Sequence, residues 1–360
     1  MNVGIIGSGQ LGWMTIIEGR KLPNRYLVLD EKKGPAGFVA DAFYTAGRYS
    51  EFVEKCDVVT YEFEHVDGRA LEAADSAGKL RPGLLPVRLK RERILEKEFL
   101  RDSGFPVGSF SVASGREEAL RLAGSYERSV VKASQGGYDG KGQYFIDRDN
   151  GSPPAIDIED RFVVEEWIDF DAEASVIASR GAAGEFRAHT PSFNLNRRGM
   201  LFYNSAPYGD FGMTDIVRRL MDRLDYVGVM GVEFFIADGR ALINEFAPRV
   251  HNTGHHTLHG SSISQFEQHV RAITGLPVPE PRLHVPSGVI NIIGRDLPPS
   301  VQERILSLPG TSIYWYGKEG IRRRRKVGHV NITAASTSGL NSTTKEVSSI
   351  LYGDDPDSFL

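Results

Sequence analysis

Residues 232–259 read VEFFIADGRALINEFAPRVHNTGHHTLH, and this stretch indicates the fold more strongly than any other part of the chain. Two largely apolar runs, Gly231 to Ala237 and Ala241 to Phe246, flank the pair Asp238-Gly239. An Asp-Gly pair between two strand-like runs is the strongest short-range signal of a β-hairpin. The stretch therefore predicts two antiparallel strands joined by a tight turn.

Two acidic residues take opposed places in this predicted hairpin. Glu233 lies near the start of the first run and Glu245 near the end of the second, with Asn244 beside it. Antiparallel pairing sets the two carboxylates roughly opposite, where they repel each other unless a cation lies between them. Mg²⁺ prefers such oxygen ligands and completes its shell with water and phosphates. The pair is a candidate ATP-Mg²⁺ site; the alternative is a solvent-facing hairpin whose acids pair with lysines or arginines.

Four histidines follow the hairpin, at positions 251, 255, 256 and 259. His255 and His259 stand four residues apart, the spacing that would align two zinc ligands on one face of a helix. Asn, Thr and Gly residues interrupt the segment, and no third ligand type is specified. Histidines that contact a polar substrate or hydrogen-bond within the fold are the alternative to a metal site.

Composition narrows the class of protein. The chain has 360 residues, 41% of them hydrophobic and 25% charged, with a net charge of −4, which is typical of a soluble globular protein. We expect no membrane segment, and no broad nucleic-acid binding despite the basic run Arg322 to Arg325. The single cysteine, Cys56, excludes an internal disulfide and is expected to be a buried structural residue. No secretory signal is visible at the start, so we expect a cytoplasmic protein.

The amino terminus carries a competing signal. The segment VGIIGSGQLGWM places Gly7, Gly9 and Gly12 between a buried-strand pattern and a helical stretch, and a second strand ends at Asp30. Strand, glycine loop, helix and a later acid form the dinucleotide-binding fingerprint. Taken alone, this pattern predicts an NAD-dependent dehydrogenase. The alternative is the same strand-turn-helix unit without a dinucleotide.

The middle of the chain combines helices with a second glycine-rich turn. Apolar residues at helical spacing predict helices over Arg88 to Ser103 and Arg116 to Ala123. The strand SVVKAS then carries Lys132, and GGYDGKGQYFI follows it. Such a turn lets backbone N–H groups converge on an anion, to which Lys132 could add a positive charge. An ordinary glycine-rich hairpin is the alternative.

Fewer signals come from the rest of the chain. The segment RFVVEEWI predicts a buried strand bearing Glu165 and Glu166, and Ser261 to Thr274 has the spacing of a helix. From about Pro281 we expect a smaller unit of short strands and turns, in which the last twenty residues are uninformative.

The order of these parts resembles that of ATP-grasp ligases, and the detailed motifs are similar to one family of them, 5-(carboxyamino)imidazole ribonucleotide synthase, the ATPase subunit of phosphoribosylaminoimidazole carboxylase. The resemblance extends to about Val330 and rests on GQLG (9–12), TYEFEHV (60–66), GYDGKGQ (137–143), the block 165–173, NEFAPRVHNTGHHT (244–257) and SQFEQHVRAITGLP (264–277).

The resemblance implies a fold of mixed α/β and α+β class with three units. These are a Rossmann-like N-terminal domain over residues 1–86, a central ATP-grasp domain over 87–278 with a mobile lid at about 108–168, and a small C-terminal domain over 279–360. It also implies a homodimer.

The resemblance further assigns roles within the site. It implies Arg93 and Lys132 at the ATP phosphates, residues 137–143 in the lid loop, 165–168 at adenine and Glu173 at the ribose. The full ATP set is Arg93, Lys132, Gly137, Tyr138, Asp139, Gly140, Lys141, Gly142, Gln143, Glu165, Glu166, Trp167, Ile168, Glu173, Asn196, Asn244 and Glu245. Mg²⁺, or Mn²⁺ in its place, would be held by Glu233 and Glu245. The substrate set is Glu64, His251, Asn252, Lys318, Arg325 and Lys326, and the catalytic set is Arg249, Tyr138 and Lys318.

The implied reaction couples bicarbonate to 5-aminoimidazole ribonucleotide at the expense of ATP, in purine biosynthesis. Another ATP-grasp carboxylase or ligase, with the same ATP site and a different acceptor, is the main alternative. Four residues depart from the family pattern: Trp13 replaces an arginine, Asn196 a nucleotide-contacting histidine, Val250 a proline and Val327 a methionine. None of these departures removes an implied metal ligand or phosphate-binding lysine.

Overall fold

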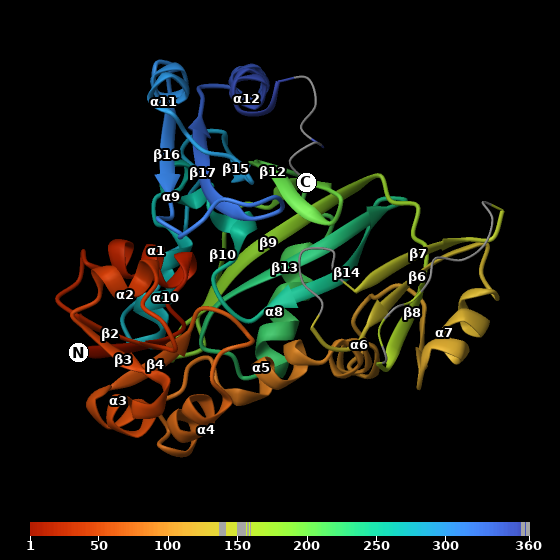
Figure 1. Cartoon of the computed structure of the whole chain (residues 1–360), viewed down its shortest axis with the longest axis horizontal. Helices are drawn as coiled ribbons and strands as arrows, with labels where there is room; N and C mark the ends of the chain where they lie inside the picture. The colour runs from red at the N-terminus through yellow and green to blue at the C-terminus, as the bar shows by residue number, and fades with distance from the viewer. Residues whose placement is uncertain (137–141, 150–155, 157, 159, 354–356, 358–360) are drawn as a thin grey trace.

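The computed structural model describes residues 1–360 except 137–141, 150–155, 157, 159, 354–356 and 358–360. Within the described residues the strands form three sheets. Figure 1 shows the N-terminal unit on the left, a small sheet on the right and a large sheet between them. The mixed α/β and α+β class that the sequence predicts is confirmed.

A parallel sheet with the order β3-β2-β1-β4 forms the N-terminal unit. The apolar residues of its inner strands are buried, as a parallel sheet covered by helices on both faces requires. The strand pattern before the glycine loop and the strand ending at Asp30 are confirmed as β1 and β2. The elements are β1 (Asn2–Ile6), α1 (Gln10–Gly19), β2 (Arg25–Asp30), α2 (Pro35–Val39), β3 (Ala42–Thr45), η1 (Ala46–Arg48), α3 (Tyr49–Lys55), β4 (Val58–Tyr61) and α4 (Gly68–Ser76).

The helix predicted over Arg88 to Ser103 is wrong in one respect that matters for the site. The chain forms two helices instead, α5 (Leu84–Arg91) and α6 (Arg93–Asp102), separated by Glu92 in an extended conformation. The break occurs because the backbone N–H of Arg93 donates to the carbonyl of Ser134 (2.9 Å) instead of continuing the helix. Arg93 thereby stands at the first position of α6, beside the strand that carries Lys132.

The small sheet is antiparallel, with the order β5-β8-β6-β7, and α7 covers one of its faces. The apolar side of the sheet packs on the alanines of the helix. The predicted helix over Arg116 to Ala123 and the predicted buried strand at RFVVEEWI are both confirmed. The elements are β5 (Phe110–Ala113), α7 (Arg116–Ala123), β6 (Arg128–Ala133), β7 (Gln143–Asp147) and β8 (Phe162–Glu166).

The large sheet has the order β14-β13-β9-β11-β12-β15-β17-β16, with β10 paired to β9. The predicted hairpin is confirmed as β13 and β14, and Asp238 (φ 50°) and Gly239 (φ 70°) form its turn. The strands are β9 (Ala172–Arg180), β10 (Phe186–Ala188), β11 (Ser192–Arg197), β12 (Met200–Ala206), β13 (Gly228–Ala237), β14 (Arg240–Ala247), β15 (Ser287–Ile293), β16 (Thr311–Trp315) and β17 (Lys326–Thr333).

Alternation along β13 separates the core from the site. Val232, Phe234 and Ile236 point to the core, where α8 packs, while Glu233 and Phe235 point to the opposite face. The helices on this sheet are α8 (Met213–Arg223), η2 (Asn252–Gly254), α9 (Thr257–Gly260) and α10 (Gln265–Ile273). Helix α10 confirms the helix predicted over Ser261 to Thr274.

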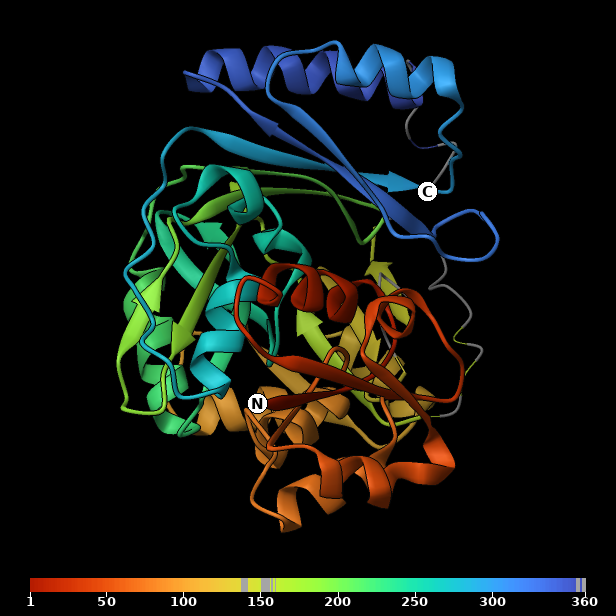
Figure 2. The same cartoon turned by 90° about the vertical axis from the view of Figure 1, so that its left-hand side faces the viewer.

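The C-terminal part is more than short strands and turns. Its strands β15, β17 and β16 continue the large sheet, because β15 pairs with β12. Helix α11 (Pro299–Leu306) precedes β16, and the final stretch forms the long helix α12 (Thr337–Tyr352). Figure 2 shows α11 and α12 together across the top of the molecule, above the sheet. In the part of the chain that the structure describes, no helix is long and apolar enough to span a membrane.

Candidate active site

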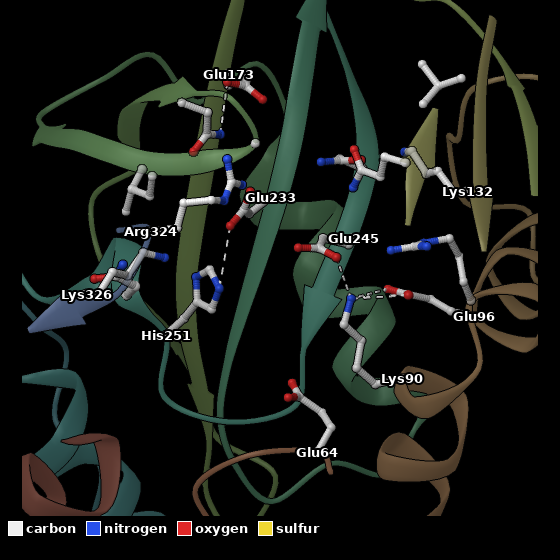
Figure 3. Close-up of a pocket in the computed structure, with 18 of the residues that line it drawn as sticks. Glu64, Lys90, Glu96, Lys132, Glu173, Glu233, Glu245, His251, Arg324 and Lys326 are labelled. Carbon is white, nitrogen blue, oxygen red and sulfur yellow. Dashed lines mark hydrogen bonds and ion pairs between the residues drawn. The ribbon is translucent and has the colours of Figure 1, made fainter. Parts of the chain in front are cut away.

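A pocket of about 870 Å³ lies where the small sheet, the large sheet and the N-terminal unit meet. Its walls come from β6 and β8 on one side, β9, β13 and β14 behind, and the loop before β17 on the other side. Figure 3 shows the labelled acids and lysines of this pocket pointing into one space. Residues from all three parts of the chain therefore face a single cavity.

The hairpin places its two acids as the sequence predicts. Glu233 pairs directly with Glu245 across the strands, and a bulge follows at once, so that Phe234 pairs with Ile243. Because the bulge leaves Asn244 as an extra residue, both Asn244 and Glu245 face the pocket. The alternative of a solvent-facing hairpin fails for Glu233, whose side chain is only 16% exposed, but holds in part for Glu245, which is 41% exposed and pairs with a lysine.

Glu233 and Glu245 differ in the charged groups that surround them. Burial, and then the negative charges of Glu245 and Glu173, raise the pKa of Glu233 to about 8. The imidazole Nε2 of His251 lies 3.5 Å from Glu233, but burial, with Arg249 nearby, lowers the pKa of His251 to about 3. His251 is therefore neutral and supplies no positive charge that would favour the ionised form of Glu233.

Lys90 is the cation that faces Glu245. Its Nζ donates to Glu245 (2.7 Å) and lies 3.3 Å from Glu96, whose carboxylate also accepts the backbone N–H of Phe246 (2.9 Å). Burial acts to raise the pKa of Glu245, but Lys90 outweighs it and holds that pKa well below its usual range. Sequence reasoning missed both Lys90 and Glu96.

These residues fit a divalent cation. Ionising both carboxylates on these adjacent strands would set two negative charges against each other, which is why the pKa of Glu233 is raised, and a bound cation would relieve that repulsion. Carboxylate and amide oxygens are the ligands that Mg²⁺ prefers, and Asn244 supplies an amide next to Glu245.

A second charged cluster lies at the small sheet. Glu165 on β8 contacts Lys132 on β6, and its other carboxylate oxygen lies 3.0 Å from Nζ of Lys97 on α6. Burial opposes the charged form of Glu165, yet Lys132 and then Lys97 lower its pKa to about 2. Arg93, whose Nη1 donates to the carbonyl of Ala133 (2.6 Å), stands beside them. Three cationic groups thus gather where the resemblance implies the ATP phosphates.

The end of the pocket between the small sheet and β13 is apolar and aromatic. Phe170 and Phe235 stack with ring centroids 4.8 Å apart, and Phe145 meets Trp167 edge to face at 5.9 Å. Glu166 is exposed, while Trp167 and Ile168 are half-buried in the pocket wall. Such a surface fits the flat faces of a purine base.

Glu173 faces this end of the pocket and contacts Asn196. The Asn196 amide donates to its carboxylate (3.0 Å), and burial raises the Glu173 pKa. Asn196, which stands where the resemblance implies a histidine, therefore orients Glu173, which the resemblance implies at the ribose.

The opposite end of the pocket is polar. Nη2 of Arg249 donates to one carboxylate oxygen of Glu64 (3.1 Å), and its Nε lies 3.0 Å from the other oxygen, so the two side chains form a close ion pair. Both polar atoms of the buried Asn252 amide lack a hydrogen-bond partner among the described residues. A buried amide without partners is costly, so the Asn252 amide fits a role in holding a ligand.

The loop before β17 closes this end with positive charge. Lys318 donates to the carbonyl of Lys326 (3.0 Å), and Arg325 donates to the carbonyls of Gly320 (2.7 Å) and Glu319. All three cationic residues line the pocket, as do Arg322 to Arg324.

Part of the implied set lies outside the described residues. This applies to Gly137, Tyr138, Asp139, Gly140 and Lys141. Gly142 has φ 65°, and the neighbouring Gln143 begins β7 opposite Lys132 and lines the pocket.

The amino-terminal glycine loop has no place for a dinucleotide phosphate. The N–H groups of Gly9 and Gly12 donate to the carboxylate of Glu62 at 2.5 and 2.9 Å. Asp30, which would hold the ribose of such a cofactor, accepts the N–H of Ser8 (2.7 Å) instead. The donors of this helix N-terminus are thus satisfied by a carboxylate of the protein itself, which argues against the dehydrogenase interpretation.

The remaining histidines do not assemble a metal site. His256 lies 3.3 Å from the Ser287 hydroxyl and His259 lies 2.9 Å from the Tyr314 hydroxyl. His255 packs against His329 with ring centroids 4.8 Å apart. Among the residues that the structure describes, no three His, Cys, Asp or Glu side chains are grouped so that they could hold a metal ion.

Comparison with known protein families gives three matches along the chain. Residues 1–85 match the ribonucleotide synthetase preATP-grasp domain, 98–266 the ATP-grasp domain and 287–343 the phosphoribosylaminoimidazole carboxylase C-terminal domain. N5-carboxyaminoimidazole ribonucleotide synthase from Saccharolobus solfataricus is 46% identical over 354 residues, 97% of this chain and 96% of the relative. The enzyme of the same name from Aquifex aeolicus is also 46% identical, over 98% of each chain.

The chain belongs to the N5-carboxyaminoimidazole ribonucleotide synthase family. The sequence resemblance and the ATP-grasp fold are thereby confirmed, and the chain is an ATP-dependent ligase.

Solved structures agree with this assignment. The ATPase subunit of phosphoribosylaminoimidazole carboxylase from Aquifex aeolicus superposes with a TM-score of 0.86 at 43% identity, covering 98% of this chain and all of that one. A synthase from Aspergillus clavatus in complex with ADP and 5-aminoimidazole ribonucleotide superposes with a TM-score of 0.84 at 27% identity, covering 97% and 98%. The predicted activity, ATP-dependent carboxylation of aminoimidazole ribonucleotide in purine biosynthesis, is confirmed at the level of this synthase family.

The other departures from the family pattern are packed into the fold. Val250 and Val327 are buried in apolar clusters. Trp13 meets Tyr314 and Tyr316 edge to face, each at 6.4 Å. In the described part of the chain, the residues that line the pocket do not include any of these three.

Proposed function

We propose that this chain carboxylates 5-aminoimidazole ribonucleotide with bicarbonate and ATP, and that the reaction takes place in the pocket described above. The observation that carries the proposal is the placement of two unlike ends in one cavity. A cationic and aromatic end fits a purine nucleotide, and a polar end with a basic loop fits a second, phosphorylated ligand.

The ATP end has a role for each group of side chains. Arg93 and Lys132 would hold the phosphates, with Lys97 and Glu165 fixing Lys132 in place. The aromatic end of the pocket, together with the segment 165–168, would receive adenine. Glu173, oriented by Asn196, would accept the ribose hydroxyls. Residues 137–143 would form the lid loop over the phosphates.

Glu233 and Glu245 would hold Mg²⁺, or Mn²⁺ in its place, with Asn244 at the phosphates. The metal would supply positive charge that stabilises the transferring phosphoryl group. Lys90 and Glu96 would position Glu245 for this task, since Lys90 contacts both acids.

The ribonucleotide would occupy the polar end. Glu64, His251 and Asn252 would contact the base and sugar, Arg249 and Lys318 would lie nearest the reacting groups together with Tyr138, and Arg325 and Lys326 would bind the phosphate. An arginine binds phosphate with two parallel hydrogen bonds, which suits it to this position.

The chemistry then runs in two steps. A bicarbonate oxygen attacks the γ-phosphorus of ATP, the bond to the β-phosphate oxygen breaks, and ADP and carboxyphosphate result. The exocyclic amine of the ribonucleotide next attacks the carboxyl carbon, or CO₂ released from it, and phosphate and a proton leave. Water must be excluded because it would hydrolyse carboxyphosphate, so a closing lid over a dry pocket is part of the proposal.

We further propose three units over residues 1–86, 87–278 and 279–360, with the lid at about 108–168. A cytoplasmic homodimer completes the proposal. The continuous β12–β15 pairing means that the second and third units would share one sheet.

Phosphate release with each substrate omitted in turn tests the function. We expect release to require ATP and bicarbonate and to rise on addition of 5-aminoimidazole ribonucleotide, with formation of its carboxylated product. Release that is indifferent to the ribonucleotide, but stimulated by another acceptor, would assign the chain to a different ATP-grasp reaction.

A further inference from the structure

The loop between β16 and β17 contains an arginine in an unfavourable backbone conformation. The N–H of Arg325 donates to the carbonyl of Arg322 (3.1 Å), which closes a tight turn over residues 322–325. Arg324, the third residue of this turn, has φ 63°. Turns that require positive φ at this position normally fill it with glycine or asparagine. Arginine here is strained where glycine would not be, so its side chain needs an explanation.

The strained residue differs from its neighbours in burial and in contact. Arg322 and Arg323 are exposed, whereas Arg324 is half-buried. Its Nη2 donates to the backbone carbonyl of Arg198 at 3.0 Å. Arg198 lies in the turn between β11 and β12, where it has φ 48° and Gly199 has φ 73°. Two tight turns that are 126 residues apart are thus joined through one guanidinium.

Each of the two turns belongs to one end of the pocket. The loop before β17 carries Lys318 and Arg325 and leads into Lys326, the first residue of β17; of these, Arg325 and Lys326 are the proposed phosphate-binding residues. Strand β11 carries Asn196, which orients Glu173 at the ATP end. Figure 3 shows Arg324 and Lys326 on the same side of the pocket as Glu173 and Glu233. The bond between Arg324 and Arg198 therefore connects the loop to the strand that serves the nucleotide.

We propose that Arg324 is a positioning residue that docks the basic loop onto the β11–β12 turn and thereby sets the affinity for the ribonucleotide phosphate. The proposal rests on the proposed function for the identity of that ligand. A charged donor to a carbonyl gives a stronger hydrogen bond than a neutral donor does. Without it the loop must be ordered when the phosphate binds, and ordering a loop on binding reduces affinity.

The variant Arg324→Gly removes the guanidinium and relieves the backbone strain together. We expect the KM for the ribonucleotide to rise about tenfold, equivalent to about 1.4 kcal/mol, while kcat and the KM for ATP change less than about twofold. We expect the Tm to stay within about 2 °C of the wild-type value, because strain relief offsets the lost hydrogen bond. Arg324→Lys, which keeps the charge and a donor, should restore part of the affinity.

Arg198→Gly is the matched control. It also removes one arginine from a position with positive φ, but it keeps the backbone carbonyl that accepts the hydrogen bond. Arg198 is exposed and does not line the pocket. We expect the kinetic constants of this variant to match those of the wild type. Arg323→Gly controls for charge, because Arg323 lies in the same turn and also lines the pocket. A rise of the ribonucleotide KM in Arg323→Gly or in Arg198→Gly equal to that in Arg324→Gly would show that lost charge, and not the docking contact, is responsible, and would overturn the proposal.

Hydrogen exchange separates the docking contact from the identity of the ligand. The backbone amides of residues 317–325 should exchange faster in Arg324→Gly than in the wild type or in Arg198→Gly, without any substrate present. Equal exchange in all three proteins would overturn the docking role. Faster exchange in a protein whose phosphate release ignores the ribonucleotide would instead leave the contact standing and reject the proposed substrate.

Discussion

The glycine loop at residues 7–12 and the β13–β14 hairpin both carry patterns that favour an ionic ligand, but the fold treats them differently. In the loop, the N–H groups of Gly9 and Gly12 already donate to Glu62. In the hairpin, Glu233 faces Glu245, and burial with nearby acids raises its pKa to about 8. A pattern marks a binding site where the fold leaves its charge uncompensated, and not where another residue of the chain has taken the place of the ligand.

The largest expected effect is at the hairpin. Glu245→Gln removes a proposed metal ligand and the partner of Lys90, so we expect ATP turnover to fall by a factor of at least about 100. Circular dichroism should show that the fold survives. Near-normal phosphate release by the folded variant would mean that the hairpin is not the cation site.

A smaller effect is expected at the far end of the pocket. Arg325→Ala removes a proposed phosphate contact worth about 1.5–3 kcal/mol, so the KM for the ribonucleotide should rise about ten- to a hundredfold while that for ATP stays nearly constant. Arg323→Ala removes an exposed arginine from the same turn, so it shows how much of the change in KM comes from lost charge alone. Unchanged constants in Arg325→Ala would leave this end of the pocket without its proposed ligand.

The charge imbalance at Glu233 predicts a pH dependence. Its pKa rises from 4.5 to about 8 on folding, so the metal-free protein holds a proton there that the unfolded chain releases above pH 4.5. The stability that this group contributes is therefore lost as pH rises toward 8. Mg²⁺ must displace that proton, so its affinity should rise by up to about tenfold per pH unit and level off above pH 8.

Calorimetry at several pH values checks this dependence, and Glu233→Gln serves as the control because it has no proton to release. A flat profile for wild-type Mg²⁺ binding between pH 6.5 and 8.5 would contradict the role of Glu233, whose folded pKa of about 8 lies inside that range.

The smallest effect on turnover is expected at the glycine loop. Glu62→Ala leaves the N–H groups of Gly9 and Gly12 without their acceptor, which should cost about 2 kcal/mol of stability measured by chemical denaturation. ATP turnover per folded molecule should change little, because the loop has no nucleotide role in the proposal. A large loss of turnover without loss of stability would show that the loop takes part in catalysis.

Local patterns were sufficient to predict the parts of the fold whose signals lie close together. Asp238-Gly239 marked the hairpin, and apolar spacing marked α7 and α10. The break at Glu92 was missed because its cause is a hydrogen bond from Arg93 to Ser134, far away in sequence. A helical pattern read alone runs straight through such a break.

The site shows the same division. The two hairpin acids were found because one turn brings them together, and the phosphate-side residues came from the family resemblance. Lys90, Glu96 and Lys97 were missed because they look like the charged face of a helix, and their partners Glu245 and Glu165 lie on distant strands. The carboxylate of Glu62 accepts the N–H groups of the glycine loop although it lies 50 or more residues away in sequence, and no local pattern contains such a pairing.

Calorimetric titration of the wild-type protein with ADP and with NADH, each with and without Mg²⁺, tests the contrast between the two motifs most directly. We predict saturable binding of ADP in the micromolar range that is strengthened by Mg²⁺ and loses that strengthening in Glu245→Gln. We predict no saturable binding of NADH up to about 1 mM. Saturable binding of NADH that disappears in Asp30→Ala, or ADP binding indifferent to both Mg²⁺ and Glu245, would contradict the account.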